Sequence, residues 1–234
     1  MTERGRASLE QARDRLTIGP SSLEWRNDAL VIRINEISAP VPRSIRGEII
    51  LHAPAINRRE FTLETQGRHI WRPIAPAARV DVNLQSPDLN WRGQAYFDTN
   101  AGDEPLEKAF TEWTWSRAHI GDGAAIFYDA TKRREPPLSL ALRVDAAGDV
   151  QETDPPPVAI LPKTKWGLSR RTRAPEAIAR VRRDLEDTPF YSRSLVESHW
   201  DGAAVDWMHE SLSLDRFANP IVRLMLPFRM PRRG

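Results

Sequence analysis

Hydrophobic and polar positions alternate in short runs along most of the chain, and Gly, Pro, Asn or Asp bound each run. Alternation with a period of two is typical of strands that bury one face. The pattern therefore predicts strands over residues 29–34, 44–51, 60–64, 78–84, 90–97, 124–128 and 138–144.

Short polar segments between these runs predict hairpin turns. They are Asn27-Asp28, the stretch 145–149 with Gly148 inside it, and Asp201-Gly202. An Asp-Gly pair between two alternating arms favours a type I′ turn. Successive hairpins indicate an antiparallel meander, and the 19 prolines punctuate the strands.

Only two segments have helical spacing of their apolar positions. In residues 8–16, Leu9, Ala12 and Leu16 share one helical face. In residues 175–185, positions 178, 181 and 185 do the same, although the Arg and Val residues there also suit an edge strand. We therefore predict an all-β fold in which antiparallel strands close into barrels or sandwiches. The domain boundary is predicted near residue 110, which divides the chain into domains 1–110 and 111–234.

Composition removes several classes of chemistry. The chain has 40% hydrophobic and 28% charged residues, a formal net charge of +2 and no cysteine. The lack of cysteine excludes disulfides, thiolate nucleophiles, Cys-ligated zinc and iron–sulfur clusters. Nucleic-acid binding would need a local basic cluster, for which the candidates are Arg170, Arg171, Arg173, Arg180, Arg182 and Arg183. No recognition motif accompanies them, so no nucleic-acid partner is expected.

The densest group of polar and aromatic residues lies between positions 69 and 107. His69 and Trp71 are two residues apart, as are Tyr96 and Asp98, so each pair points to one face of a strand. Asp98 is expected to end its strand and to open the loop 99–105. An Asp before Thr-Asn-Ala-Gly also suits an ordinary Asx turn, and the aromatic residues also suit a core.

Two other arrangements receive less support from spacing. Carboxylates at positions 98, 103, 104 and 107, beside Trp113 and Trp115, would suit a glycoside hydrolase, although carboxylates this close in a loop are more often solvated. His199, Asp201 and His209 fall on a predicted hairpin, but no metal-binding spacing supports them, so no metal site is predicted. Phosphate-binding glycine motifs and a Gly-x-Ser-x-Gly elbow are also absent from the sequence.

Several stretches resemble the carotenoid 1,2-hydratase (hydroxyneurosporene synthase) family, and together they span nearly the whole chain. They are Met1 to Arg6, His69 to Ile74, Tyr96 to Glu107, Trp113 to Ala118, Thr188 to Leu195, His209 to Phe217 and Leu226 to Arg232. The most specific of them is Tyr-x-Asp-x-Asn-Ala-Gly at positions 96–102.

The resemblance implies two lipocalin-like β domains and the addition of water across the C1–C2 double bond of acyclic carotenoids such as neurosporene or lycopene. It implies no cofactor, with Asp98 as the proton donor and His69, Trp71 and Tyr96 as its catalytic partners. Trp71, Tyr96, Trp113 and Trp115 are expected to bind the substrate. Family members usually carry additional sequence before the stretch that corresponds to Met1 to Arg6. The resemblance therefore predicts that the first domain here lacks some strands.

Three further expectations follow from the chemistry. An acid that protonates an alkene at neutral pH must be desolvated, so Asp98 is predicted to have a raised pKa and a hydrogen bond from His69 or Tyr96. Because carotenoids reside in lipid, a cytoplasmic protein that binds membranes peripherally is expected, with residues 226–233 as the surface that contacts lipid. A lipocalin-like lipid carrier and a cyclase or isomerase that uses the same protonation remain the alternatives.

Overall fold

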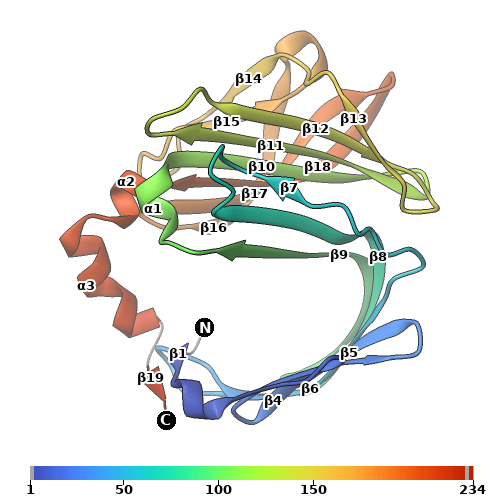
Figure 1. Cartoon of the computed structure of the whole chain (residues 1–234), viewed down its shortest axis with the longest axis vertical. Coiled ribbons are helices and arrows are strands. Elements are labelled where there is room, and N and C mark those ends of the chain that lie inside the picture. The colour runs from blue at the N-terminus through green and yellow to red at the C-terminus, as the bar shows by residue number, and fades with distance from the viewer. Residues whose placement is uncertain (1–2, 230–231, 234) are drawn as a thin grey trace.

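Two lobes built on β-sheets are joined by a long hairpin in the computed structural model, which describes residues 3–229 and 232–233. Figure 1 shows the N-terminal sheet as the lower lobe and a second sheet as the upper lobe, with strands β8 and β9 running from one to the other. Helix α3 descends on the opposite side, and both chain ends lie beside the lower lobe.

The lower lobe is an eight-stranded sheet of antiparallel pairs. Its order is β2 (Leu9–Gln11), β3 (Arg15–Ile18), β4 (Ser21–Arg26), β5 (Ala29–Ile37), β6 (Ser44–His52), β8 (His69–Ser86) and β7 (Phe61–Thr62), with β9 (Asp88–Gly102) also paired to β8.

The upper lobe is a seven-stranded antiparallel sheet. Its order is β13 (Val150–Thr153), β12 (Leu138–Val144), β11 (Gly123–Lys132), β10 (Phe110–Ile120), β18 (Ala203–Ser213), β17 (Tyr191–Trp200) and β16 (Ala179–Asp187). In the described part of the chain both large sheets have free end strands, so they are open sheets and not closed barrels.

Smaller elements complete the chain. The hairpin of β14 (Val158–Leu161) and β15 (Arg170–Arg173) packs on the seven-stranded sheet, and β1 (Glu3–Arg4) pairs in parallel with β19 (Arg232–Arg233). The helical elements are α1 (Leu106–Ala109), α2 (Leu214–Phe217), α3 (Pro220–Arg229) and the 3-10 turns η1 (Arg6–Ser8) and η2 (Pro175–Ala177).

The predicted all-β fold is confirmed, and each predicted strand lies in or overlaps an observed one. The shortest match is β7, which covers only two of the five predicted residues. The predicted turns also form: Asn27 has φ +53°, and Asp201 and Gly202 have φ +49° and +81°, as a type I′ turn requires.

Both predicted helices are wrong. Residues 8–16 form η1, β2 and the start of β3, because β3 finds a hydrogen-bonding partner in β4. Residues 175–185 begin with η2, where Glu176 and Ala177 have positive φ, and continue as the edge strand β16 along β17. In both segments, pairing with a neighbouring strand outweighs a weak helical preference.

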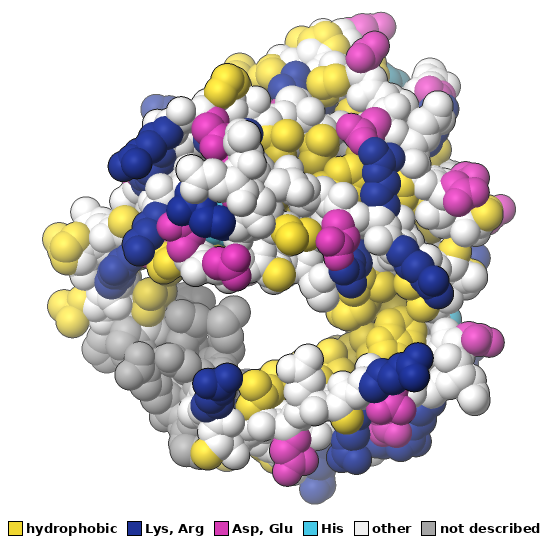
Figure 2. All heavy atoms as spheres, in the orientation of Figure 1, with side chains coloured by type: hydrophobic (Ala, Val, Ile, Leu, Met, Phe, Trp, Pro, Cys, Tyr) yellow, Lys and Arg dark blue, Asp and Glu magenta, His cyan; other side chains and the backbone are white. Residues whose placement is uncertain are grey.

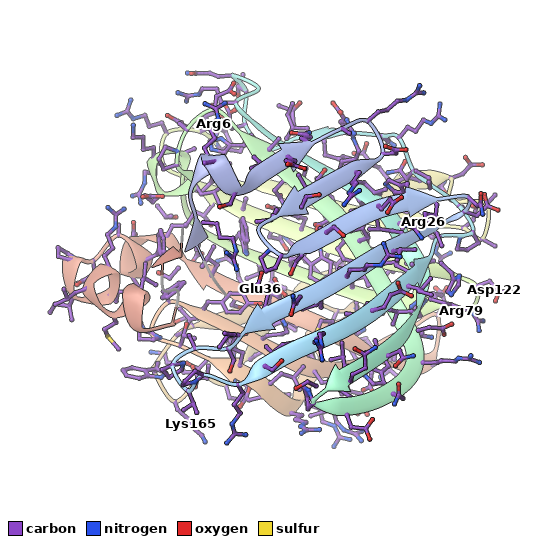
Figure 3. All side chains as sticks on the ribbon, turned by 90° about the horizontal axis from the view of Figure 1, so that it is seen from below. Arg6, Arg26, Glu36, Arg79, Asp122 and Lys165 are labelled. Carbon is purple, nitrogen blue, oxygen red and sulfur yellow. The ribbon has the colours of Figure 1, made fainter. Side chains whose placement is uncertain are left out.

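The two faces of the N-terminal sheet differ in polarity. Strand alternation and register place apolar residues in rows across one face: Trp25, Leu30, Leu51 and Val80 in one row, and Leu23, Ile32, Ile49, Val82 and Trp91 in the next. Figure 2 shows hydrophobic side chains on the wall of an opening between the lobes. The other face carries Glu24, Arg33, Glu48 and Asp81, and Figure 3 looks onto it from below, with Arg26 and Arg79 labelled.

The seven-stranded sheet has a core on each face. One core joins Ile126 and Trp115 of this sheet to Trp71 of β8 and Phe61 of β7. The other places Phe127, Val196 and Trp207 beneath Leu161 of the β14–β15 hairpin. The predicted domain division near residue 110 stays a prediction, and the first core contains residues from both sides of it.

Replacing Phe127 by Ala should destabilise the protein by about 3–5 kcal/mol, because the buried ring packs at 4.8 Å on Trp207 and at 5.5 Å on Trp200. Urea denaturation would measure the loss. The exposed residue Leu185 provides the matched control, since Leu185→Ala should change stability by less than about 0.5 kcal/mol. Equal effects of the two substitutions would contradict the described packing.

Candidate active site

The segment that carries Asp98 lies where the pairing of β8 with β9 is interrupted twice. Register shifts leave residues 73–74 of β8 opposite Asp98, and residues 76–77 opposite Tyr96. Pro73 and Pro76 lie in these bulges, and proline has no N–H with which to continue a ladder. Asp98 therefore lies inside β9, and the expectation that it ends the strand and opens the loop 99–105 is wrong. The strand continues to residue 102 because β8 still offers a partner.

Side chains from outside the hairpin bind the carbonyl groups of the bulges. The Asn57 side chain donates to the Pro73 carbonyl at 3.0 Å, and its backbone N–H donates to the Ile74 carbonyl at 2.8 Å. Arg117 of β10 donates to the Pro76 carbonyl at 2.9 and 2.6 Å and to the Ala95 carbonyl at 3.1 Å. Burial lowers the pKa of Arg117 to about 10, so it stays charged at neutral pH. These bonds hold the backbone around Asp98.

Asp98 receives two hydrogen bonds on the same oxygen. The indole Nε1 of Trp71 donates to Oδ2 at 2.8 Å, and the hydroxyl of Tyr96 donates to Oδ2 at 3.0 Å. No hydrogen bond within residues 3–229 and 232–233 reaches Oδ1 from another side chain. When Asp98 is neutral, its proton therefore belongs on Oδ1, while Oδ2 remains an acceptor.

Burial raises the pKa of Asp98, and the hydrogen bonds from Trp71 and Tyr96 oppose this effect without cancelling it. Burial and the neighbouring Asp98 carboxyl also raise the pKa of Tyr96 well above its usual value, so its hydroxyl stays protonated and remains a donor. The arrangement favours a carboxylic acid that keeps its proton more readily than an exposed Asp.

Aromatic rings surround this acid. Trp71 is fully buried and packs at 5.0 Å on Tyr128, which packs at 5.9 Å on Trp113, while Tyr96 packs at 4.8 Å on Trp115. All four aromatic residues that the sequence singled out thus lie in one cluster with Asp98. Such a cluster can exclude water and present ring faces to a cation.

His69 lies on the same strand as Trp71 but makes other contacts. Its Nε2 is 3.1 Å from the Glu104 carbonyl, and its Nδ1 is 3.8 Å from the carboxylate of Glu64. Its ring packs at 5.1 Å on Phe110. Of the two hydrogen bonds to Asp98 that the sequence allowed, the structure forms the one from Tyr96, and the catalytic role of His69 stays a prediction.

The family model described as "Carotenoid hydratase CrtC" matches residues 1–234 of the sequence. The chain belongs to the carotenoid hydratase CrtC family. The resemblance carried by the Tyr-x-Asp-x-Asn-Ala-Gly stretch and the flanking motifs is thereby confirmed.

Relatives named acyclic carotenoid 1,2-hydratase match the chain over its full length. A Thiocapsa roseopersicina protein is 54% identical and a Rubrivivax gelatinosus protein is 43% identical, and the chain spans 58% of the length of each. A Cereibacter sphaeroides protein is 43% identical, and the chain spans 84% of it.

A solved structure, described as an AttH protein of Nitrosomonas europaea, has a similar fold. Its TM-score is 0.56 at 14% sequence identity, and the match covers 89% of this chain and 72% of that one. Identity at this level indicates a shared fold alone.

Three residues of this family member join the site without having been singled out from the sequence. Tyr128 is 3% exposed, and its hydroxyl has no hydrogen-bond partner among the described residues. The second residue is Glu210, which lies in one cross-strand row with Tyr128 and Trp115 on the face that packs on Trp71. The third residue is Arg117. Tyr128 lies in a predicted strand and Arg117 lies in the stretch that carries Trp113 and Trp115, but only strand pairing reveals that Tyr128 packs on Trp71 and that the Arg117 guanidinium lies over the Tyr96 ring.

The loop carboxylates that suggested a glycosidase are engaged elsewhere. Glu104 forms an ion pair with Arg68 at 3.2 Å, and Glu107 forms one with Arg223. Most of the arginines that suggested nucleic-acid binding are also paired: Arg170 with Asp184, Arg171 with Glu112, Arg173 with Asp129, and Arg180 and Arg182 with Glu197.

His209 and Asp201 of the predicted hairpin have separate partners. His209 is fully buried and bonds Ser116 through Nδ1 at 2.8 Å and Ser211 through Nε2 at 3.0 Å, and Asp201 pairs with Arg143. Burial lowers the pKa of His209 to about 3, so its ring is neutral at physiological pH. Within residues 3–229 and 232–233, no three His, Asp or Glu side chains gather as metal ligands would.

Removing the Tyr96 hydroxyl should raise the pKa of Asp98 further. A hydrogen bond to the ionised carboxylate favours that form, so Tyr96→Phe removes one of the two side-chain hydrogen bonds that oppose the effect of burial on the pKa. Carbon-13 NMR of labelled Asp carboxyl groups would report the titration. Tyr191→Phe is the control, because the Tyr191 hydroxyl contacts Arg193 and not Asp98. An unchanged Asp98 titration in Tyr96→Phe would refute the contact.

Asp98→Asn should make the protein more stable than the wild type at neutral pH. Because the folded-state pKa of Asp98 is raised, its contribution to stability is present below the unfolded pKa and is lost as pH rises through the folded pKa. Asn has no such loss. The difference in thermal midpoint between Asp98→Asn and the wild type should therefore increase as pH rises and stay constant below about pH 4. A gap that narrows as pH rises would show the opposite pKa shift.

Proposed function

We propose that this chain is an acyclic carotenoid 1,2-hydratase that adds water across the terminal C1–C2 double bond of a substrate such as neurosporene or lycopene. The observation that carries the proposal is the half-buried Asp98, whose Oδ2 accepts hydrogen bonds from Trp71 and Tyr96 while desolvation raises its pKa. Membership in the hydratase family supports the reaction class.

The first step is protonation of the alkene. Asp98 transfers the proton on Oδ1 to C2, and the alkene π electrons form the new C–H bond, leaving a tertiary cation at C1. As Asp98 becomes a carboxylate, the Trp71 and Tyr96 donors become charge-assisted and strengthen. Because they are already in place, little reorganisation accompanies the transfer.

The aromatic cluster then stabilises the cation. Trp71 and Tyr96 are the two aromatic residues that hydrogen-bond the acid, and Trp113, Trp115 and Tyr128 extend the cluster around them. A desolvated cation gains about 0.5–2 kcal/mol from each well-placed ring. We assign Trp71, Tyr96, Trp113 and Trp115 to binding of the substrate end.

Water completes the reaction by attacking C1, and its proton returns to the Asp98 carboxylate. The sum is addition of H and OH, so the oxidation level of the substrate and the state of the enzyme are unchanged. The reaction as written uses no cofactor. His69 bonds the Glu104 carbonyl beyond the end of β9, and its part in catalysis is proposed to be the holding of this end of the hairpin.

The apolar face of the N-terminal sheet suits the rest of the long hydrocarbon. Phe97 lies on that face and packs near Trp25, whereas Tyr96 and Asp98 alternate with it on the same strand. β9 pairs only with β8 in the described part of the chain, so its other edge is free. A hydrocarbon on the apolar face can reach Asp98 around this edge. Because such a substrate dissolves in lipid, peripheral membrane association belongs to the proposal.

Asp98→Asn should fold normally and lose product formation by about 10²–10⁴-fold, the usual contribution of a general acid. Product masses after incubation with lycopene and neurosporene would measure the loss. Asp81→Asn is the control, because Asp81 lies on the charged face and pairs with His52 and Arg92.

Three outcomes would overturn the proposal. Turnover by Asp98→Asn at the wild-type rate would remove Asp98 from the mechanism. Tight binding of lycopene without any product from the wild type would indicate a carrier. Products of unchanged mass but altered double bonds or rings would indicate an isomerase or a cyclase.

A further inference from the structure

Helix α3 presents apolar side chains to the outside of the protein. Ile221, Leu224 and Met225 are 71%, 73% and 45% exposed. Their i, i+3, i+4 spacing places them on one face of the helix, which we call the α3 stripe. Figure 1 shows α3 outside both sheets, and Figure 2 shows hydrophobic side chains projecting on that side with Lys and Arg side chains beside them.

The rest of α3 is anchored to the protein. The Asn219 side chain accepts a hydrogen bond from the Ile221 N–H at 2.9 Å, and the helix follows α2, whose Leu214 is buried in the core that contains Trp71. Arg223, on the side away from the stripe, pairs with Glu107 of α1. These contacts attach α3 to the protein through the side opposite the α3 stripe, so the stripe faces away from the protein.

Charge around the stripe is positive. Residues 220–234 contain four arginines and no Asp or Glu. A surface hollow next to the Arg223–Glu107 ion pair is lined by five Lys or Arg side chains and four Glu side chains. Two of its basic residues, Lys108 and Arg134, have no ion-pair partner among the described residues. An apolar stripe beside basic residues is complementary to an anionic bilayer, in which acyl chains lie beneath negative headgroups.

We infer that the α3 stripe is a docking surface for anionic lipid bilayers. The inference deepens the proposed function and rests on it for the source of the substrate. None of the helices in the described part of the chain is long and apolar enough to cross a bilayer, and docking of this kind needs none. The expectation that residues 226–233 contact lipid concerns side chains that mostly lie outside those the structure describes.

Sedimentation with vesicles tests the inference on the full chain. Wild type should pellet with vesicles of phosphatidylcholine and phosphatidylglycerol in a ratio of about 3:1, and less with phosphatidylcholine alone. The double variant Ile221→Glu/Leu224→Glu should lose at least about tenfold in partitioning. The control is Ile160→Glu/Ile178→Glu, which replaces two exposed aliphatic side chains elsewhere on the surface by the same acid and should bind as wild type does.

A labelled variant gives a gain of signal that does not depend on a disruptive substitution. Because the chain has no cysteine, Leu224→Cys can carry a single environment-sensitive dye. Its emission should shift to the blue on phosphatidylglycerol vesicles, whereas dye at Ile160→Cys should not respond. Equal responses at both positions, or wild-type binding by Ile221→Glu/Leu224→Glu, would overturn the inference. A concentration-dependent dimer that the double variant abolishes would also overturn it, by showing that a second copy covers the stripe.

Activity assays separate this inference from the proposed function. Ile221→Glu/Leu224→Glu should convert lycopene dispersed in detergent as wild type does, and should convert lycopene embedded in vesicles at least about tenfold more slowly. If the wild type binds vesicles but forms no product from lycopene in detergent or in vesicles, the hydratase proposal alone would be refuted. Product from detergent without any vesicle binding would refute the docking surface alone.

Discussion

The antiparallel pairing of β8 with β9 is the constraint on which the rest of the structure depends. At one end the hairpin belongs to the N-terminal sheet through its pairing with β6, and at the other it packs on the seven-stranded sheet. Two bulges bend it between these positions, and Asn57 and Arg117 bind the carbonyls that the bulges release from the ladder. A change of one residue in this register would turn Asp98 and Tyr96 to the opposite face.

The same constraint sets the chemistry of the acid. Glu64 is as deeply buried as many core residues, and burial opposes its ionisation, yet three backbone N–H groups keep its pKa below the usual value. Asp98 receives two side-chain donors on one oxygen, and for it burial has the larger effect. The balance between desolvation on one side and donors and nearby positive charge on the other therefore separates a carboxylate that supports a turn from a carboxylic acid that can donate a proton.

Apolar surface is distributed in a way that suits a substrate dissolved in lipid. The inner face of the N-terminal sheet is lined with aliphatic and aromatic rows, its outer face carries ion pairs, and the α3 stripe lies outside both lobes. Asp98 and Phe97 occupy opposite faces of one strand, so the acid and the apolar wall are separated only by the thickness of β9 and its free edge.

The sequence by itself determined the strand content, the hairpin turns and the type of residue at the site, because alternation and turn chemistry are local properties. Trp71, Tyr96 and Asp98 could be chosen from their spacing and family motif, and they do meet. The sequence could not identify the strands at residues 9–18 and 179–187, because pairing with neighbouring strands overrides the helical spacing of their apolar positions. Nor could it place Tyr128, Arg117 and Glu210, which come from strands distant in sequence. Only the tertiary structure decided the bulges, the burial of Asp98 and the contacts of His69, because each depends on which strands pair and in which register.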